Sequence, residues 1–521
     1  MNDLGKSVRH VMTIFLFCFI ALISYIAYFQ VFKGPNIASD SGNVRLWAKR
    51  NEILRGSIYD RNGTELATSE RIDETSQKRN YLYGNLFVHP LGYIDQTYGL
   101  SGLEETYDDE LSNYSTFRNG INDFLDTVHP RDLIRNLKED KANTGSFNFK
   151  ENFNTFIDDM NFGMLVGKSD SKEGNGIVTT LDTALQQVAY DALGDNKGSV
   201  VAINPKTGEI LAMVSKPTFN PNDLAAEMEK ANEGSGDDTP LINRAIDGIY
   251  PPGSVFKTVT LSSALENMPG VSERQFDDEG KITFDDGVEL NNYAHEVHGI
   301  IDLRRAYRVS SNVVFGTLAM ELGNEKLKDT AESFGFNSVI KGEGFTATAS
   351  QFPKLEDYEK GNIAQSGIGQ GSVLSTPMQM ALVTAAVAND GVLMRPKLVN
   401  SIVDKNGNVV RNISSEEIRQ AIPSDVAATV KDYMKYLVDN NTHRWPAFEG
   451  TNAGGKTGTA DYNLPDGTEA VPHGWFIAAA PMDDPQIAVA VIVENGESGA
   501  GSAAIIASQV VRQAVLGYWY N

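Results

Sequence analysis

Cysteine is almost absent from this chain of 521 residues, which has only Cys18, so neither an internal disulfide nor a cysteine-ligated metal site is possible. Histidine is scarce too, and the segment His295-Glu-Val-His298 is one residue short of the H-E-x-x-H zinc motif. We therefore expect no metal and no cofactor. Basic residues number 45 against 68 acidic ones, for a net charge of −23. This balance disfavours a nucleic-acid partner, because phosphate binding depends on clustered Lys and Arg.

One long uncharged run lies near the N-terminus, at residues 11–32. As an α-helix it would be about 33 Å long, at roughly 1.5 Å per residue, which is enough to cross a hydrocarbon core of about 30 Å. We therefore predict a transmembrane anchor there, with residues 1–10 as a short tail. Basic residues flank the run on both sides, so the charge rule alone leaves its orientation open.

The chain changes character after the predicted anchor. Residues 33–178 are polar and interrupted by glycines, and residues 60–63 (Asp-Arg-Asn-Gly) predict the turn of a β-hairpin. Adjacent acids such as Glu104 and Glu105 favour a solvated face over a catalytic pair. From about residue 179, apolar strand patterns occur at both ends, with helical patterns between them. This order predicts an α+β fold in which one antiparallel sheet is covered by helices.

Residues 179–521 contain recognisable helix starts and strand pairs. A helix is predicted to follow an N-cap at Thr180 or Asp182, and another to begin directly after Pro252-Gly253. The remaining predicted elements are a β-hairpin at residues 198–215, strands at residues 473–481 and 486–496, and a closing helix at residues 502–520.

The segment GTNAGGKT, residues 450–457, fits the nucleotide-binding pattern G-x-x-x-x-G-K-[ST]. That pattern requires a buried strand before it and a helix directly after it, and neither is predicted here. We expect the segment GGKTGTA to be an edge strand instead. Alternation then puts Lys456 and Gly458 on one face and Thr457 and Thr459 on the other. A cation beside hydroxyls and open backbone amides suits a substrate carboxylate.

The sequence Ser254-Val-Phe-Lys257 is an S-x-x-K motif at the predicted start of a helix. Residues three apart share one helix face, so the Ser254 hydroxyl and the Lys257 amine are predicted to meet. A helix start also offers free backbone amides to an oxyanion. The motif alone carries little weight, because residues 169–172 repeat it in a polar stretch.

Two further motifs follow in a fixed order, residues 310–312 (Ser-Ser-Asn) and residues 456–458 (Lys-Thr-Gly). A second Lys-Thr-Gly occurs at residues 206–208, in a predicted hairpin turn. Only the set that begins at Ser254 has the right order and lies on suitable elements, namely a helix start, a loop before a helix and a strand. That set is typical of serine acylation chemistry.

These motifs, with YPPGSVFKT, SGIGQGSVLSTP, GGKTGTA and HGWFIAAAP around them, make the chain similar to the class B penicillin-binding proteins. That family comprises membrane-anchored peptidoglycan D,D-transpeptidases. The resemblance runs from about residue 178 to the end, and RGSIYDRNG resembles the family's N-terminal pedestal. It implies a serine transpeptidase domain at residues 179–521, preceded by an elongated, mainly β pedestal at residues 33–178. Asp461 departs from the family, which often has Glu or Gln there.

The resemblance also implies a role for each motif residue. Ser254 would attack the penultimate D-Ala carbonyl, Lys257 would act as its base, and Ser310 would relay a proton to the leaving amine. Burial and the nearby charge of Lys456 would both lower the pKa of Lys257. The implied substrate-binding residues are Asn312 for the donor amide, and Lys456, Thr457, Gly458 and Thr459 for the terminal carboxylate, with the amides of Ser254 and Thr459 as the oxyanion hole.

The partners that the resemblance implies are peptidoglycan stem peptides ending in D-Ala-D-Ala, β-lactam antibiotics and the membrane. A glycosyltransferase of the division or elongation machinery is a further implied partner. Because the substrate lies outside the cytoplasmic membrane, we expect a single-pass protein with a cytoplasmic N-terminus and an extracytoplasmic catalytic domain.

Four other functions remain open, three that use the same motif residues and one that needs no catalysis. A D,D-carboxypeptidase would pass the acyl group to water instead of an amine. A serine β-lactamase or a penicillin-sensing receptor would also acylate, although the Ser-Ser-Asn form of the second motif and the long pedestal count against both. A catalytically idle scaffold that recruits cell-wall machinery would not need the complete set.

Overall fold

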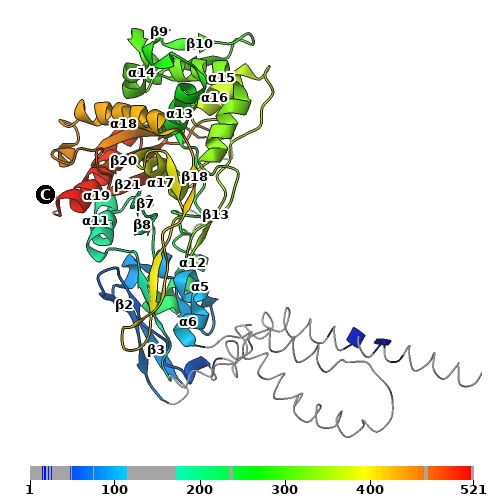
Figure 1. Cartoon of the computed structure of the whole chain (residues 1–521), viewed down its shortest axis with the longest axis vertical. Helices are drawn as coiled ribbons and strands as arrows, with labels where there is room; N and C mark the ends of the chain where they lie inside the picture. Colours follow the sequence, from blue (N-terminus) through cyan, green and yellow to red (C-terminus); the bar gives the residue numbers. More distant parts are fainter. Residues whose placement is uncertain are drawn as a thin grey trace, which may run out of the picture.

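The computed structural model describes residues 50–73, 76–113, 172–233, 239–462 and 468–517, together with a few isolated residues nearer the N-terminus. The described part is elongated, with a large head at one end and a smaller body, called the pedestal below, at the other (Figure 1). The head is built around a five-stranded sheet and the pedestal around a six-stranded one.

The head sheet is antiparallel throughout and has the order β19-β20-β21-β7-β8. Every residue of β20 and β21 is buried, which matches their continuous apolar sequences. β19 is an edge strand, so one row of its backbone groups is free of ladder partners. The strands are β7 (Gly198–Ile203), β8 (Ile210–Lys216), β19 (Gly454–Ala460), β20 (His473–Ala480) and β21 (Ile487–Val493).

Helices cover both faces of the head sheet (Figure 1). Alternate residues of β20 enter different cores, with Phe476 and Ala478 packed in one and Trp475 and Ile477 in the other. The predicted α+β fold, one antiparallel sheet between helices, is therefore confirmed. α11 (Thr183–Leu193) and α19 (Ala504–Leu516) cover the first face, and α13 (Lys257–Asn267), α17 (Pro377–Ala388) and α18 (Ser424–Asp439) the second.

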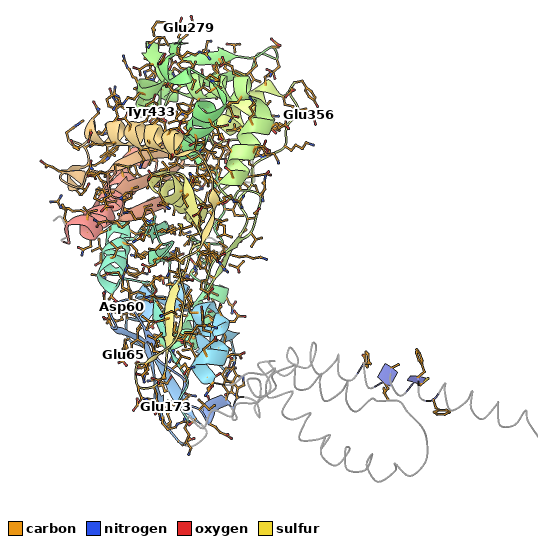
Figure 2. The ribbon with its side chains drawn as sticks, in the orientation of Figure 1. Asp60, Glu65, Glu173, Glu279, Glu356 and Tyr433 are labelled. Carbon is orange, nitrogen blue, oxygen red and sulfur yellow. The ribbon has the colours of Figure 1, made fainter. Side chains whose placement is uncertain are left out.

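The predicted local signals hold in the structure. Asp182 caps α11 by accepting a hydrogen bond from the backbone N–H of Leu185 at 3.0 Å. Asp60 organises the predicted hairpin turn, since its Oδ1 accepts from the N–H groups of Asn62 and Thr64, both at 2.8 Å. Its Oδ2 accepts from the Thr183 hydroxyl at 2.7 Å, which joins the pedestal to the start of α11 (Figure 2).

A helical region with short strands stands above the second face of the head sheet (Figure 1). It supplies the junction between two helices at which the predicted Ser-Ser-Asn motif lies. Its elements are β9 (Gln275–Asp278), β10 (Lys281–Thr283), β11 (Glu289–Asn291), β12 (Gly299–Asp302), α14 (Leu303–Val309), α15 (Asn312–Ser333) and α16 (Lys360–Gly367). Shorter pairs are β13 (Ile340–Lys341) with β14 (Thr346–Ala347), and β15 (Val392–Met394) with β18 (Glu417–Gln420).

The pedestal sheet combines segments that are far apart in the sequence. Its order is β17-β16-β6-β1-β2-β3, and β16 and β17 lie within the predicted transpeptidase domain (Figure 1). Strands from both sides of the predicted domain boundary at residue 178 therefore pair in this one sheet. Its strands are β1 (Ile58–Tyr59), β2 (Glu65–Arg71), β3 (Gln77–Tyr81), β6 (Gly176–Thr179), β16 (Val399–Val403) and β17 (Val409–Asn412). Around it lie α4 (Val88–Leu91), β4 (Ile94–Asp95), β5 (Gly99–Leu100), α5 (Gly102–Thr106), α6 (Asp108–Ser112) and α12 (Leu224–Glu233).

The predicted anchor, residues 11–32, lies outside the described residues except for a few isolated positions. Among the helices that the structure describes, none combines the length and apolarity needed to cross a bilayer. The anchor and the tail at residues 1–10 therefore stay predictions.

The expectation of a solvated face at Glu104 is wrong. Glu104 is fully buried and forms ion pairs with Arg55 at 2.6 Å and Arg79 at 2.7 Å. Burial raises the pKa of the Glu104 carboxyl, but the two guanidinium groups outweigh this effect and the net pKa is lowered. The neighbouring Glu105 is exposed. The buried carboxylate thus joins β3 and the segment before β1 to α5.

We expect the substitution Glu104→Ala to lower the free energy of unfolding of the pedestal by about 3 kcal/mol, because it leaves the buried guanidinium group of Arg79 without a carboxylate and that of Arg55 with Asp108 alone. Urea unfolding followed by circular dichroism would measure the change. Glu105→Ala is the matched control and should change the free energy by less than about 0.5 kcal/mol. Equal effects of the two substitutions would contradict a structural role for the buried ion pairs.

Candidate active site

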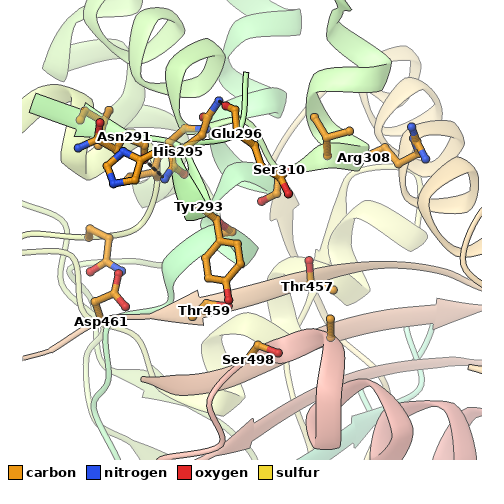
Figure 3. A pocket seen from close by; sticks show the side chains of 18 of the residues that line it. Asn291, Tyr293, His295, Glu296, Arg308, Ser310, Thr457, Thr459, Asp461 and Ser498 are labelled. Carbon is orange, nitrogen blue, oxygen red and sulfur yellow. Dashed lines mark hydrogen bonds between the residues drawn. The ribbon is translucent and has the colours of Figure 1, made fainter. Parts of the chain in front are cut away.

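A cleft of about 1060 Å³ lies between the head sheet and the helical region above it, and it brings the three predicted motifs together (Figure 3). Ser254, Ser310 and Asn312 line it, and Thr457 and Thr459 line it from β19. The second Lys-Thr-Gly, residues 206–208, does not contribute to its lining, and the second S-x-x-K lies almost entirely outside the described residues.

Ser254 lies in a single 3-10 turn, Gly253–Phe256, which leads directly into α13. The predicted helix start after Pro252-Gly253 is thus confirmed. The turn is fixed from two sides: Gly253 has φ 54° and donates its N–H to Gly369 O at 2.8 Å, and Trp475 Nε1 donates to Pro251 O at 3.0 Å. A Cβ on Gly369 would lie 2.2 Å from Gly253 O, so only glycine permits this approach. Ser254 itself remains partly exposed to the cleft.

Lys257 is completely buried one turn further along. Its amine donates to Ser310 O at 2.6 Å, to Asn312 Oδ1 at 2.7 Å and to Ser310 Oγ at 3.2 Å. These contacts occupy the three N–H donors of a protonated lysine. The predicted Ser254–Lys257 hydrogen bond is not formed, since no described residue bonds to Ser254 Oγ. Lys257 donates to the second motif instead.

The Ser-Ser-Asn motif occupies the sharp junction between α14 and α15, as the sequence predicts. Ser310 ends α14 in the left-handed conformation, with φ 60° and ψ 40°, which is costly for a residue with a side chain. Ser311 caps α15 by accepting from Val314 N at 3.0 Å. This junction turns the carbonyl and the hydroxyl of Ser310 toward the same lysine, and the strain marks the position as functional.

Lys456 is the second completely buried lysine of the site. Its amine donates to Ser310 Oγ at 2.9 Å and to Thr457 O at 2.9 Å. No ion pair of Lys456 occurs within the described ranges. Burial lowers the pKa of Lys456 to about 7. The segment around it is an edge strand with no helix directly after it, so the nucleotide-binding interpretation stays excluded.

The two lysine amines share one hydroxyl, that of Ser310. Burial lowers the pKa of Lys257 well below its usual range, and the positive charge of Lys456 lowers it further, as predicted. A neutral Lys257 can accept a proton from Ser310 Oγ while that oxygen accepts one from Lys456. The arrangement offers a path for a proton between the two amines through Ser310, which lines the same cleft as Ser254.

Gly458 lies where β19 contacts the turn Gly253–Phe256, which contains Ser254. A Cβ at this position would lie 2.9 Å from Val255 Cγ1 and 3.0 Å from Pro252 O. Thr457 and Thr459 on either side of it face the cleft, whereas Lys456 and Gly458 are buried, so the predicted alternation of faces is confirmed. Gly458 therefore keeps the strand close enough for its neighbours to flank Ser254.

Several residues of the site have no signal in the sequence. Asp278 is fully buried, and its carboxylate accepts from Ser311 Oγ at 2.6 Å and from Asn292 Nδ2 at 2.7 Å. Asn292 Oδ1 in turn accepts from the Asn312 backbone at 2.8 Å. Asp278 lies in an acidic run that resembles solvated surface, so only the fold identifies it. Tyr293, Arg308 and Ser498 also line the cleft without such a signal. His295, Gln370 and Asp461 line it too, and each lies in a segment that the sequence patterns single out.

The chain matches two family models. Residues 198–512 match the penicillin binding protein transpeptidase domain, and residues 55–131 match the penicillin binding protein A dimerisation domain. The first match covers more than half of the chain and includes all three motifs.

Known proteins support the same assignment. The chain is 31% identical to the peptidoglycan D,D-transpeptidase PbpA of Mycolicibacterium smegmatis over 517 residues, which cover 95% of this chain and 94% of that protein. It is 29% identical to the peptidoglycan D,D-transpeptidase MrdA of Acinetobacter baumannii, over 86% of this chain and 66% of that protein.

Solved structures agree in fold over nearly the whole described chain. Penicillin-binding protein A from M. tuberculosis, in a ceftriaxone acyl-enzyme complex, has a TM-score of 0.74 and 27% identity, over 90% of this chain and 100% of that one. The D,D-transpeptidase domain of a peptidoglycan glycosyltransferase from Eggerthella lenta has a TM-score of 0.71 and 31% identity, over 89% and 99%. On the family match, the relatives and the assembled motifs, this chain belongs to the penicillin-binding protein transpeptidase family.

Proposed function

We propose that this chain is a peptidoglycan D,D-transpeptidase that works through a Ser254 acyl-enzyme and is inhibited by β-lactams. One observation carries the proposal: the Ser310 hydroxyl lies between two buried lysine amines, 3.2 Å from Lys257 and 2.9 Å from Lys456. Beside a partly exposed serine, this chain of groups can remove a proton from the nucleophile and deliver one to a leaving amine.

In the proposed first step, Ser254 Oγ bonds to the penultimate D-Ala carbonyl carbon and its proton passes to Lys257. The bond from that carbon to the nitrogen of the terminal D-Ala then breaks, and Ser310 relays a proton to the departing amine. The backbone N–H groups of Ser254 and Thr459 stabilise the oxyanion. The terminal carboxylate is bound by Thr457 and Thr459 in the field of Lys456, beside Gly458.

In the proposed second step, an amine of a neighbouring stem peptide attacks the ester carbon. The new C–N bond forms, the bond from carbon to Ser254 Oγ breaks, and the proton of the amine returns to Ser254. Asn312 holds the donor peptide, and its side chain is already oriented because Oδ1 accepts from Lys257 and Nδ2 donates to Asn291 O at 2.7 Å.

The location follows from the substrate. We propose a single-pass membrane protein whose anchor is residues 11–32 and whose residues 33–178 and 179–521 form an extracytoplasmic pedestal and transpeptidase domain. A glycosyltransferase that makes the glycan strand is the partner that such an enzyme requires.

Benzylpenicillin should form one long-lived covalent adduct with the full-length protein and none with Ser254→Ala, because the β-lactam carbonyl replaces the D-Ala carbonyl. Intact-mass spectrometry measures the adduct. The matched control is Ser169→Ala, in the second S-x-x-K segment, which should acylate like the unmodified protein.

Two other outcomes of that experiment would contradict the proposal, and so would one outcome of an assay with a stem peptide. An adduct that disappears within seconds would indicate a β-lactamase. Folded protein that never acylates would indicate an idle scaffold. Release of D-Ala from a stem peptide without any cross-linked product, in the presence of an amine acceptor, would indicate a carboxypeptidase.

The second-order rate constant of acylation should depend on pH in a bell-shaped way. Lys257 must be neutral to accept a proton, so the rate rises through its lowered pKa as pH increases. Lys456 must be charged to attract the carboxylate, so the rate falls above its pKa of about 7. Stopped-flow measurement with benzylpenicillin across about six pH units, from pH 4 to pH 10, covers both the rise and the fall of the rate.

The substitution Lys456→Arg tests the assignment of the alkaline limb. A guanidinium group keeps its charge throughout this pH range, so the fall above pH 7 should disappear even where the overall rate is lower. Lys206→Arg, in the second Lys-Thr-Gly, should leave the profile unchanged. An alkaline limb that persists in Lys456→Arg would refute the role of Lys456 charge.

A further inference from the structure

Strand β19 runs along the cleft, so its two ends distinguish the two ends of the cleft. The start of this strand packs against α18, because a Cβ on Gly454 would lie 2.8 Å from Lys435 N. The chain that follows α18 brings Arg444 to the same end of the cleft lining. The strand then passes Thr457 and Thr459 and leads to Asp461 at the opposite end (Figure 3).

Arg308 lies at the α18 end, across Ser310 from Asp461 (Figure 3). It belongs to α14, two residues before Ser310. Its guanidinium carbon is 5.7 Å from the centre of the Tyr436 ring on α18, a cation–π contact that restrains the side chain. The arginine is therefore held in the wall of the cleft rather than free in solvent.

The charge of Arg308 is not neutralised within the part of the chain that the structure describes. No carboxylate there lies within 4.0 Å of it, and its Nε is shielded from solvent without a hydrogen-bond acceptor. Arg304, one turn earlier on the same helix, also has a buried Nε without an acceptor, but its charge is neutralised because it pairs with Asp432 at 2.8 Å. Arg444 also lines this end and has no ion pair among the described residues.

An arginine pair that lines a reactive cleft and lacks an anion favours an anionic ligand, since planar guanidinium groups match carboxylates in geometry. The acidic residue Asp461 lies at the other end of the strand (Figure 3). The α18 end is thus the positive end of the cleft. Lys456 and Thr457 already bind one carboxylate in the proposed mechanism, so Arg308 and Arg444 are available for a second one.

The direction of the reaction identifies the ligand. The bond that breaks in acylation joins the acyl carbon to the nitrogen of the terminal residue, whose carboxylate lies at Lys456 and Thr457 in the proposed mechanism. The acceptor amine attacks the same acyl carbon from the side on which that nitrogen departed. The remainder of the acceptor therefore extends toward the α18 end of the cleft.

We propose that Arg308, assisted by Arg444, binds a carboxylate on the side chain of the acceptor amino acid during transfer from the acyl-enzyme. The inference rests on the proposed function and adds specificity to its second step. In that step the amine nitrogen bonds to the ester carbon, the bond to Ser254 Oγ breaks, and the amine proton passes to that oxygen. Arg308 takes no part in proton transfer; it positions the acceptor.

The test compares two acceptors of nearly equal length on the full-length protein. A D-alanyl thioester with a thioglycolate leaving group forms the acyl-enzyme, which then partitions between water and an added amine. D-2-aminoadipate carries a side-chain carboxylate, and D-norleucine carries a methyl group in its place. Chromatography of the aminolysis and hydrolysis products gives the partition ratio for each acceptor.

With unmodified protein, D-2-aminoadipate should give the higher aminolysis ratio. Arg308→Gln should lower that ratio about tenfold, since hydrogen bonds to charged groups contribute about 1.5–3 kcal/mol. The ratio with D-norleucine and the rate of thioester consumption should change less than about twofold, because neither uses the second carboxylate. Arg304→Gln, the matched control on the same helix, should leave both ratios unchanged.

Three results would overturn the inference. Equal losses with both acceptors would reduce Arg308 to a structural residue, and a slower acylation step would assign it to the donor carboxylate. No change in Arg308→Gln would remove it from the site. Arg444→Gln, on a different segment, provides a second variant should Arg308→Gln fail to form a benzylpenicillin adduct. Failure of unmodified protein to be acylated would instead refute the proposed function itself.

Discussion

Two buried lysine amines that share the Ser310 hydroxyl form the constraint on which the rest of the site depends. Neither lysine has a carboxylate within ion-pair distance among the described residues, so burial and mutual repulsion both oppose full protonation. A pair of like charges in a water-poor site is unstable unless one amine releases its proton. In the proposed mechanism this instability favours a neutral Lys257 that can act as a base, which an exposed lysine at its usual pKa cannot do.

Holding the two amines in place requires rigid support from elements far apart in the sequence. The left-handed Ser310 sits between two helices, and the buried Asp278 fixes Ser311 and, through Asn292, the start of α15. On the opposite side, Gly369 allows close contact with the backbone of the turn that contains Ser254, and Gly458 allows that turn to approach β19. These features store strain and buried charge, and the large apolar core around the head sheet compensates for them.

The three motifs that the sequence predicts to react meet at one cleft, and they could be recognised because the proposed chemistry requires fixed residue types on particular elements. Order and context separated Ser254 and residues 456–458 from their duplicates, and apolar periodicity predicted the head sheet. Sequence reasoning missed the residues that act only through packing between distant segments. Asp278 and Glu104 both lie in acidic runs that look solvated, and only tertiary contacts give them partners. The same limit applies to β16 and β17, whose pairing with pedestal strands depends on contacts between distant segments.

The geometry of a single strand explains how so short a motif can serve several purposes. Along β19, successive side chains alternate, so Lys456 and Gly458 turn toward the packed interior while Thr457 and Thr459 face the cleft. The interior positions set the charge and the spacing, and the cleft positions offer hydroxyls to a ligand. Because β19 is an edge strand, its outer backbone groups remain available as well. A buried cation, hydroxyl donors and open amides thus lie within four consecutive residues, which is why the proposed mechanism assigns the substrate carboxylate to this edge.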